Sequence, residues 1–561
     1  MNILGLNYCF HDSSACLVED GILTIALEEE RFSRKKHTNS FPSLAADKCL
    51  ESRSLNYSDI DYIAISYVPT LNWPAKALHL AKRPTKFKSF LRHELLSAYF
   101  KERDFKKWFN SKWSKNSKKP AIHYIPHHMS HVAGSFYVSP YQEAALLGID
   151  GAGEWATSLL GVGKGTEIEC FNHSYYPQSL GAFYEAATEF CGFKPNYDEG
   201  KTMGLAPLGD ASVFYDQASK LVSITKDGRI KLDQSYFNFQ YWEYRRCSDK
   251  FYTAFGKPRT TKEFEDHHLH VAAAFQKVLE ERVLEMCEIL HNKTQMDYLV
   301  ISGGVSLNSV MNGRIVRESK FKDLYVMPAA GDNGTSIGAA YYLYNNILKQ
   351  PREFVHNNPY IGNSYTNDEY LAIIKESKLK HEFHEDITGV TAKILNEGNI
   401  ICWHQGGMEI GPRALGNRSI LANPVLPDMK DKINAEVKHR EAYRPFAPSC
   451  TVEARQEFFD IEVEAPFMLK VCDVLEDKKS VLPAITHVDG SARLQTVRKE
   501  TNPRYHELLT KFGELSGAPV LLNTSFNIMG EPIVESPYDA IRCFFSTGLD
   551  VLVLGNYVIR K

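Results

Sequence analysis

Short apolar runs alternate with longer helical patterns along most of the chain. The first thirty residues predict a three-stranded β-meander, in which Glu19, Asp20 and Gly21 form the turn between the second and third strands. Further apolar runs predict strands at 60–67, 143–150, 297–304 and 323–328. Residues 262–291 and 333–347 carry a helical period. Strands that alternate with helices indicate an α/β fold.

This pattern breaks between Gln350 and Tyr365. The stretch is rich in Pro, Asn and Gly and has no hydrophobic period, so we interpret it as a domain boundary. A second α/β segment follows and ends in the strand-like sequence LDVLVLGNYVIR. A chain of 561 residues is also too long for one core. We therefore predict two domains, at residues 1–352 and 353–561.

Composition narrows the class of protein. The hydrophobic share is 43% and the net charge is −3, which is typical of a globular protein without general affinity for nucleic acid. The 11 cysteines form no CxxC motif, which favours a reducing compartment. The start of the chain has no cationic leader. No apolar run reaches the roughly 18 residues of a membrane span. We expect a soluble, cytoplasmic protein that binds neither nucleic acid nor a membrane. Whether it forms a homodimer is left open.

One segment departs from this balance. Residues 82–119 contain thirteen Lys or Arg and three acidic residues, interleaved with Phe, Tyr and Trp. A surface that binds nucleic acid or a membrane has this composition. Because the whole chain is nearly neutral, we favour a solvated helical insertion. A lid that faces the substrate is the third interpretation.

The stretch IPHHMSHVAGSFYVSP places three histidines within five positions. His127 and His131 are four residues apart, which on a helix puts both on one face, where two imidazoles can share a metal ion. His128 points off that face, and we expect it at the surface. The alternative is a polar helix turn whose histidines bond to backbone or water.

Three glycine-bearing turns follow predicted strands in the first domain. Backbone N–H groups at such turns can approach phosphate oxygens, although tight turns also need glycine for steric reasons. Asp150 and Asp332 stand in two of these turns. With His127 and His131 they make a mixed nitrogen and oxygen donor set that suits Fe(II), Zn or Mn, while Mg²⁺ bound with a nucleotide is the alternative for the carboxylates. The candidate nucleotide-binding residues are Gly151, Gly153, Lys201, Gly303, Gly304, Asn308, Gly331 and Gly334.

The initial meander and the glycine turns resemble the actin/sugar-kinase/Hsp70 superfamily of ATP-binding folds, which implies a duplicated N-terminal domain. Five blocks in this domain resemble the O-carbamoyltransferases of antibiotic and nodulation-factor biosynthesis: HHMSHVAGSFY, IDGAGEWAT, DEGKTMGLAP, ISGGVSLN and AAGDNGTSIGAA. The domain is also similar to the ATPase that makes threonylcarbamoyladenosine in tRNA. Four blocks of the second domain look like the YrdC-like α/β domain of the same enzymes: GGMEIGPRALGNRSILANP, KHREAYRPFAPS, HVDGSARLQTV and LLNTSFNIMGEPIV.

The resemblance implies two linked reactions. The C-terminal domain would form carbamoyl-adenylate from carbamoyl phosphate and ATP, which is bound with Mg. The N-terminal domain would then transfer the carbamoyl group to a hydroxyl of a sugar or natural-product acceptor. The resemblance also implies that His127, His131, Asp150 and Asp332 are metal ligands, with iron as the metal suggested by relatives.

Two phosphorylated substrates require fixed cations and polar groups in the second domain. Arginine can hold a phosphate through two parallel N–H bonds, and asparagine or serine can hydrogen-bond a carbamoyl group or a ribose. The candidates within the second-domain blocks are Arg413, Arg418, Lys438, Arg444, Arg493, Asn523, Ser525 and Asn527.

The transfer step needs a group that accepts the proton of the acceptor hydroxyl. His11 and Asp12, at the end of the first predicted strand, are our candidates, and Lys36 is a further candidate that would contact phosphate. A turn or helix cap made by Asp12 is the alternative. Three other functions stay open: a fused enzyme of the tRNA threonylcarbamoyl pathway, a small-molecule kinase of the actin-like superfamily, and a non-enzymatic role as a metal sensor or scaffold.

Overall fold

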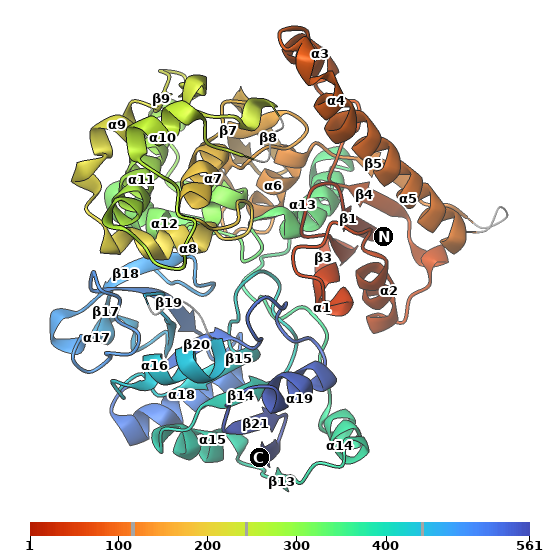
Figure 1. Ribbon diagram of the computed structural model, residues 1–561. Helices are drawn as coiled ribbons and strands as arrows, with labels where there is room; N and C mark the ends of the chain where they lie inside the picture. Colours follow the sequence, from red (N-terminus) through yellow and green to blue (C-terminus); the bar gives the residue numbers. More distant parts are fainter. Residues whose placement is uncertain (114–117, 242–244, 439–442) are drawn as a thin grey trace. The chain divides into compact units, whose positions relative to one another are not determined.

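The computed structural model of the chain describes residues 1–113, 118–241, 245–438 and 443–561. It divides into two compact units, whose elements are labelled in Figure 1. The first unit contains residues 1–29 and 37–356, and the second contains residues 30–36 and 357–561. A short segment near the start of the chain therefore belongs to the second unit. Within the described ranges, no helix is long and apolar enough to cross a membrane.

The first unit contains two five-stranded sheets of the same topology. In the order β3-β2-β1-β4-β5, the strands β1 to β3 form an antiparallel meander, and β4 and β5 continue parallel to β1. The order β8-β7-β6-β11-β12 repeats this arrangement. The strands are β1 (Asn2–Asn7), β2 (Ser14–Glu19), β3 (Ile22–Glu28), β4 (Tyr62–Ile65), β5 (Ala121–Tyr124), β6 (Glu143–Ile149), β7 (Ala156–Lys164), β8 (Glu167–Tyr175), β11 (Tyr298–Ser302) and β12 (Asp323–Val326). The predicted duplicated α/β architecture is confirmed.

The predicted elements of this unit match the observed ones closely. The turn between β2 and β3 has Asp20 and Gly21 at φ of 47° and 86°, as a tight hairpin requires. The long helical pattern is α11 (Asp266–Thr294). The pattern at 333–347 divides into α13 (Thr335–Tyr341) and the π-helical η10 (Tyr342–Ile347).

Two short helices position the centre of the first unit. The helix α6 (His127–Phe136) follows the last strand of the first sheet, and α13 follows the last strand of the second. Each packs on the sheet of the other half, α6 on β6 and β11 and α13 on β1 and β2, and the two helices also pack against each other. A Cβ atom at Gly338 would lie 1.7 Å from the carbonyl oxygen of Ser130. Glycine is therefore required where the helices cross.

The basic segment lies between β4 and β5 and is helical, as Figure 1 shows. It forms η2 (Pro84–Lys86), α4 (Phe87–Phe90), η3 (Leu91–Leu96) and α5 (Ser97–Lys112), and the helix α3 (Trp73–Ala81) directly precedes it. Phe105 and Trp108 on α5 are buried, and the Trp108 ring lies 4.9 Å from that of Phe41. One face of the insertion is thus packed against the first unit. Residues 114–117 lie outside the described residues.

The second unit is built on one ten-stranded mixed sheet in the order β13-β22-β21-β14-β15-β20-β16-β19-β18-β17. Its strands are β13 (Glu382–Phe383), β14 (Ile401–His404), β15 (Arg418–Ala422), β16 (Ala447–Thr451), β17 (Phe459–Asp460), β18 (Lys470–Val474), β19 (Ser491–Val497), β20 (Val520–Ser525), β21 (Val551–Leu554) and β22 (Tyr557–Arg560). The helices α15 (Ile387–Asn396) and α18 (Pro503–Ser516) pack against each other over an apolar core. An α/β second domain was predicted, and residues 350–365 contain no helix or strand.

Candidate active site

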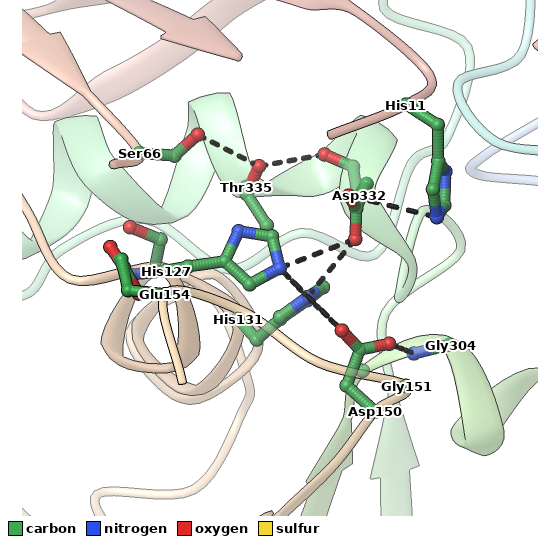
Figure 2. A network of polar contacts seen from close by, with 12 residues as sticks. His11, Ser66, His127, His131, Asp150, Gly151, Glu154, Gly304, Asp332 and Thr335 are labelled. Atoms are coloured by element: carbon green, nitrogen blue, oxygen red, sulfur yellow. Dashed lines mark hydrogen bonds and ion pairs between the residues drawn. The ribbon is translucent and has the colours of Figure 1, made fainter. Parts of the chain in front are cut away.

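Four side chains that are far apart in the sequence meet in one buried cluster of the first unit, shown in Figure 2. His127 and His131 come from α6, and Asp150 directly follows β6. Asp332 begins the short turn η9 (Asp332–Gly334), which leads into α13. The crossing of α6 and α13 brings the two histidines and this carboxylate together.

The donor atoms of the cluster have the separations of ligands around one ion. The Nε2 atoms of His127 and His131 are 3.0 Å apart. Oδ1 of Asp332 lies 3.4 and 3.3 Å from these two nitrogens, and Oδ2 of Asp150 lies 3.6 and 3.7 Å from them. Ligands held about 2.1 Å from a shared ion are separated by roughly 3.0 to 3.4 Å. The four side chains therefore fit a single divalent metal ion.

The charges of the cluster also favour a bound cation. Burial opposes a charged His127, but the carboxylates of Asp332 and Asp150 outweigh it and raise the histidine pKa to about 10. The same pairing overcomes burial and holds the pKa of both carboxyls below the usual range. Two buried carboxylates need compensating positive charge, from protons on the imidazoles or from a cation. A divalent ion supplies that charge and leaves both histidines neutral.

His128 is not at the surface, and that prediction is wrong. Its side chain is buried, and neither ring nitrogen has a hydrogen-bond partner among the described residues. Burial lowers the pKa of His128 to about 3, so the ring is neutral. A Cβ atom at Gly153 would lie 2.8 Å from its Nδ1 atom. The ring and the glycine turn after β6 therefore pack directly on each other, which the alternation of polar residues on a helix could not reveal.

Two residues that the sequence did not single out hold the cluster in place. The side-chain amide of Asn7, at the end of β1, donates to the carbonyl oxygens of His11, Asp12 and Asp332 at 3.1, 3.1 and 2.9 Å. The carboxylate of Glu154 accepts the backbone N–H of His127 at 3.0 Å. The burial of Asn7 and its partner Asp332 are visible only in the structure.

A second set of polar side chains lies beside the cluster. Nδ1 of His11 is 2.9 Å from Oδ2 of Asp12, and Nε2 of the same ring faces Oδ2 of Asp332 at 3.8 Å (Figure 2). The other oxygen of Asp12 is 2.7 Å from Nδ1 of His37, which the sequence did not single out. Asp12 has a φ of 50°, a conformation that suits Asp or Asn. The carboxylate therefore fixes the ring of His11 with one nitrogen turned toward the cluster.

The predicted glycine turns lie around the same cluster. The N–H of Gly304 donates to Oδ1 of Asp150 at 2.9 Å. Gly303 has a φ of 90°, and a Cβ atom on it would lie 2.2 Å from a carbonyl oxygen. A Cβ atom on Gly334 would lie 2.0 Å from another carbonyl oxygen. These two glycines are required by packing. A Cβ atom added to Gly151 or Gly331 would have no neighbour closer than 3.2 Å.

Three other candidates of the first domain have different surroundings. Lys201 pairs with Asp198 at 3.1 Å. The side chain of Asn308 caps α12 (Ser309–Glu318) by accepting the N–H of Met311. Lys36 is exposed and belongs to the segment Glu30–Lys36 of the second unit.

In the second unit, Arg413 lies in a loop between Glu409 and Arg418 that hydrogen bonds hold in place, and we call it the braced loop. One carboxylate oxygen of Glu409 accepts three backbone N–H groups of the loop, and Arg31 donates to the carbonyl of Gly411 at 2.8 Å. Within the described ranges, no carboxylate lies within ion-pair distance of Arg413. Burial and the nearby charge of Arg444 lower the pKa of Arg413 to about 10. Two guanidinium groups whose charges influence each other form a suitable place for an anion.

Arg418 plays a different part. Its side chain is fully buried. Its guanidinium donates to five backbone carbonyl oxygens, those of Asn363, Gln405, Gly406, Asn417 and Glu535. The guanidinium therefore stabilises the fold and presents no free edge to a phosphate.

The remaining candidates of the second unit lie on or near β19 and β20. Asn523 is buried and donates to Ser449 and Gln495. Ser525 donates to the side chain of Asn527 at 2.7 Å, and Arg493 is half-buried on β19. The side chain of Lys438 lies outside the described residues.

Comparison with known proteins gives matches along both units. The family profile described as Carbamoyltransferase N-terminus matches residues 2–341, and that described as Carbamoyltransferase C-terminus matches residues 392–561. An uncharacterized protein of Synechocystis sp. is 38% identical, with 100% of this chain and 97% of that protein covered.

Several other relatives carry descriptive names. The nodulation protein NolNO of Sinorhizobium fredii is 37% identical over 99% of this chain and 80% of its own length. The 3'-hydroxymethylcephem-O-carbamoyltransferase of Amycolatopsis lactamdurans is 34% identical over 65% of each chain. These matches confirm the resemblance found in the sequence motifs. The chain belongs to the carbamoyltransferase family and is a transferase enzyme.

Proposed function

We propose that this enzyme is an O-carbamoyltransferase that works in two steps. The domain at 353–561 consumes carbamoyl phosphate, water and ATP, and yields carbamoyl-adenylate, phosphate and pyrophosphate. The domain at 1–352 transfers the carbamoyl group to a hydroxyl of a sugar or natural product, and AMP leaves with the former acyl oxygen. The buried cluster of two histidines and two aspartates beside the His11–Asp12 pair is the observation that carries this proposal.

The cluster is proposed to hold one divalent metal ion, Fe(II) first, with Zn or Mn as the alternatives. The mixed donor set of His127, His131, Asp150 and Asp332 contains no thiolate, which agrees with these metals. A bound ion would supply a positive charge that polarises the carbamoyl oxygen or holds the adenylate phosphate. The protein contributes a rigid frame, because the histidines lie on α6, Asp150 follows β6 and Asp332 lies in the turn before α13, and α6 packs tightly on β6 and on α13.

His11 is proposed as the base of the transfer step. In the neutral ring Nδ1–H donates to Asp12, which leaves a lone pair on Nε2 on the side of the cluster. Burial disfavours the charged ring, but the carboxylates of Asp332 and Asp12 outweigh it and raise the pKa of His11, so the neutral base requires the positive charge of the ion proposed for the cluster. The attacking hydroxyl gives its proton to this nitrogen as its oxygen forms the new bond to the carbamoyl carbon. Asp12 stabilises the imidazolium that results, and the proton then leaves to solvent, since the ring of His11 is partly exposed.

The activation step is proposed to use Arg413 and Arg444 for phosphate groups. The braced loop fixes Arg413, and no carboxylate within the described ranges neutralises it. Lys438, Arg493, Asn523, Ser525 and Asn527 remain proposed contacts of ATP, which is bound with Mg, or of carbamoyl phosphate. Arg418 is left out of the proposed site because its donors are bonded to backbone carbonyls.

The N-terminal glycine turns are proposed to contact the nucleotide, with Lys36 and Lys201 as further phosphate contacts. Gly151 and Gly331 have the most open surroundings. Gly153, Gly303, Gly304, Gly334 and Asn308 would shape these turns, because their own contacts are made within the protein.

The deciding experiment is incubation of the full-length enzyme with ATP and carbamoyl phosphate. Without an acceptor we expect pyrophosphate and carbamoyl-adenylate, and once a hydroxyl acceptor is added we expect AMP in an amount equal to the pyrophosphate. Production of ADP in place of pyrophosphate would support the small-molecule kinase. Activity with threonine, bicarbonate and tRNA, but not with carbamoyl phosphate, would support the fused threonylcarbamoyl enzyme.

A further inference from the structure

Lys101 occupies a position on α5 where an apolar side chain would be expected. It precedes Phe105 by one helical turn and Trp108 by two, and both of these rings are buried, at 3% and 7% exposure. The same stripe of the helix faces the first sheet. Five other cations of α5 and η3 point outward or are paired at the surface: Arg92, Arg103, Lys106, Lys107 and Lys112.

The ammonium group of Lys101 is held against aromatic rings. Its Nζ atom lies 5.1 Å from the ring centre of Phe10 and 5.8 Å from that of Tyr67. The neighbouring carboxylate of Glu94 is bonded to Lys76 at 2.8 Å. Among the described residues, no carboxylate lies within ion-pair distance of Lys101. The cation therefore lacks a counter-ion, and two ring faces offset only part of its desolvation cost.

This cation lies next to the proposed transfer site. Phe10 immediately precedes His11, and its ring packs edge-on against the ring of His127 at 4.6 Å. Lys101 and His127 thus contact the same aromatic ring. Burial lowers the pKa of Lys101, and the charges of nearby acidic groups, Asp332 among them, act in the opposite direction. A partly buried lysine that has no carboxylate partner and lies beside a reaction centre is suited to bind an anion.

We propose that Lys101 binds an anionic oxygen of the ligand in the transfer site, a phosphate or carboxylate oxygen. Such a ligand supplies the missing counter-ion through a charge-assisted hydrogen bond. The oxygen comes either from the phosphate of the carbamoyl donor or from an acidic group of the acceptor. The inference rests on the proposed function for the identity of the site. It also gives the basic insertion a role, since α5 delivers this one cation inward.

The test measures how fast Lys101 is acetylated in the full-length protein at limiting acetic anhydride, with peptides quantified by mass spectrometry. AMP, inorganic phosphate and adenosine are the probes. We expect AMP or phosphate to slow acetylation of Lys101 at least about tenfold, whereas adenosine has no effect. Lys107, exposed on the same helix, is the internal control and should react equally in all samples.

The two sources of the anion give different results. Protection by AMP at a lower concentration than by phosphate assigns the oxygen to the nucleotide. Succinate is added as a carboxylate probe, and protection by succinate but not by AMP or phosphate assigns the oxygen to an acidic group of the acceptor. Unchanged acetylation of Lys101 with AMP, phosphate and succinate overturns the proposal.

Variants add a second measurement. We expect Lys101→Met to weaken AMP binding at least about tenfold, and Lys101→Arg to restore it to within about threefold. Lys107→Gln is the matched control and should bind AMP as the wild type does. Pyrophosphate formation from ATP and carbamoyl phosphate should persist in Lys101→Met. If the wild type forms no pyrophosphate, the proposed function fails, whereas unprotected Lys101 in an enzyme that forms pyrophosphate refutes only the role of Lys101.

Discussion

Asn7 and Asp332 are joined by a hydrogen bond of 2.9 Å from the side-chain amide of the first to the carbonyl oxygen of the second. The same amide donates to the carbonyls of His11 and Asp12. One buried side chain at the end of β1 thus ties the loop of the proposed base to the backbone of a proposed metal ligand. The loop of His11 and Asp12 and the turn of Asp332 are therefore held by hydrogen bonds from the same side chain, that of Asn7, which we call the polar anchor.

This anchor predicts a large effect of a small change. Asn7→Asp keeps the shape of the side chain but turns a buried carboxylate toward three carbonyl oxygens. We expect the free energy of unfolding to fall by at least about 3 kcal/mol, measured by urea denaturation. Asn7→Ser, which keeps a donor, should cost less. Equal stability of Asn7→Asp and the wild type would contradict the described hydrogen bonds.

The ligand set predicts the metal content of variants. His131→Ala and Asp332→Asn should each lose most of the bound metal, measured by inductively coupled plasma mass spectrometry on purified protein. Pyrophosphate formation should continue in both, while carbamoyl transfer is lost. His93→Gln is the control, because this exposed histidine on η3 has no place in the cluster. Full transfer activity in His131→Ala would refute the metal assignment.

The His11–Asp12 pair predicts a selective loss of the second step. His11→Gln should lower the rate of carbamoyl transfer by roughly 10²-fold or more with little change in pyrophosphate formation. Asp12→Asn is the matched test of orientation, since asparagine tolerates the positive φ of this position. We expect an intermediate loss in Asp12→Asn. Retained metal in both variants would show that the loss concerns the base, whereas an unchanged transfer rate in His11→Gln would exclude it.

Arg413 and Arg418 predict opposite outcomes for the same substitution. Arg413→Met should leave the melting temperature close to that of the wild type and abolish pyrophosphate formation, because this guanidinium has no carboxylate partner among the described residues. Arg418→Met should lower the free energy of unfolding by more than about 3 kcal/mol, since each of five carbonyl oxygens loses a hydrogen bond from the guanidinium. A stable Arg418→Met that lacks activity would return this residue to the proposed binding site.

The close crossing of α6 and α13 predicts that one added methyl group lowers stability. Gly338→Ala should destabilise the first unit by at least about 2 kcal/mol and reduce metal binding, because the new Cβ atom would overlap the carbonyl of Ser130. Gly200→Ala, on a helix with nothing within 4 Å of the added atom, is the control and should be neutral or slightly stabilising. Thermal unfolding and metal analysis of both variants test this.

The parts of the site that were predictable from the sequence are those carried by local periodicity. The spacing of His127 and His131 predicts a shared helix face, and the apolar runs predict the strands whose ends carry the polar loops. His128 shows the limit of that reasoning. A helix with polar residues on two faces was expected to expose one, but α6 is packed on a sheet, on α13 and on the glycine turn after β6.

Tertiary partners explain the other differences. Arg413 and Arg418 stand in the same motif, and only the fold shows that Glu409 braces the loop of the first while backbone carbonyls engage the second. Asn7 and His37 were missed because their partners are distant in sequence or lie in irregular loops. Residue type and spacing carry no information on such contacts.

The repeated sheets also set the order in which the cluster can be assembled during synthesis. The first half supplies two imidazoles and the second half begins with one carboxylate, but the last oxygen donor comes from the turn that precedes α13. Until this turn has emerged from the ribosome, the nascent chain has three of the four donors and lacks α13, which packs against α6. Loading of an ion during translation must therefore wait until nearly the whole first unit has left the ribosome.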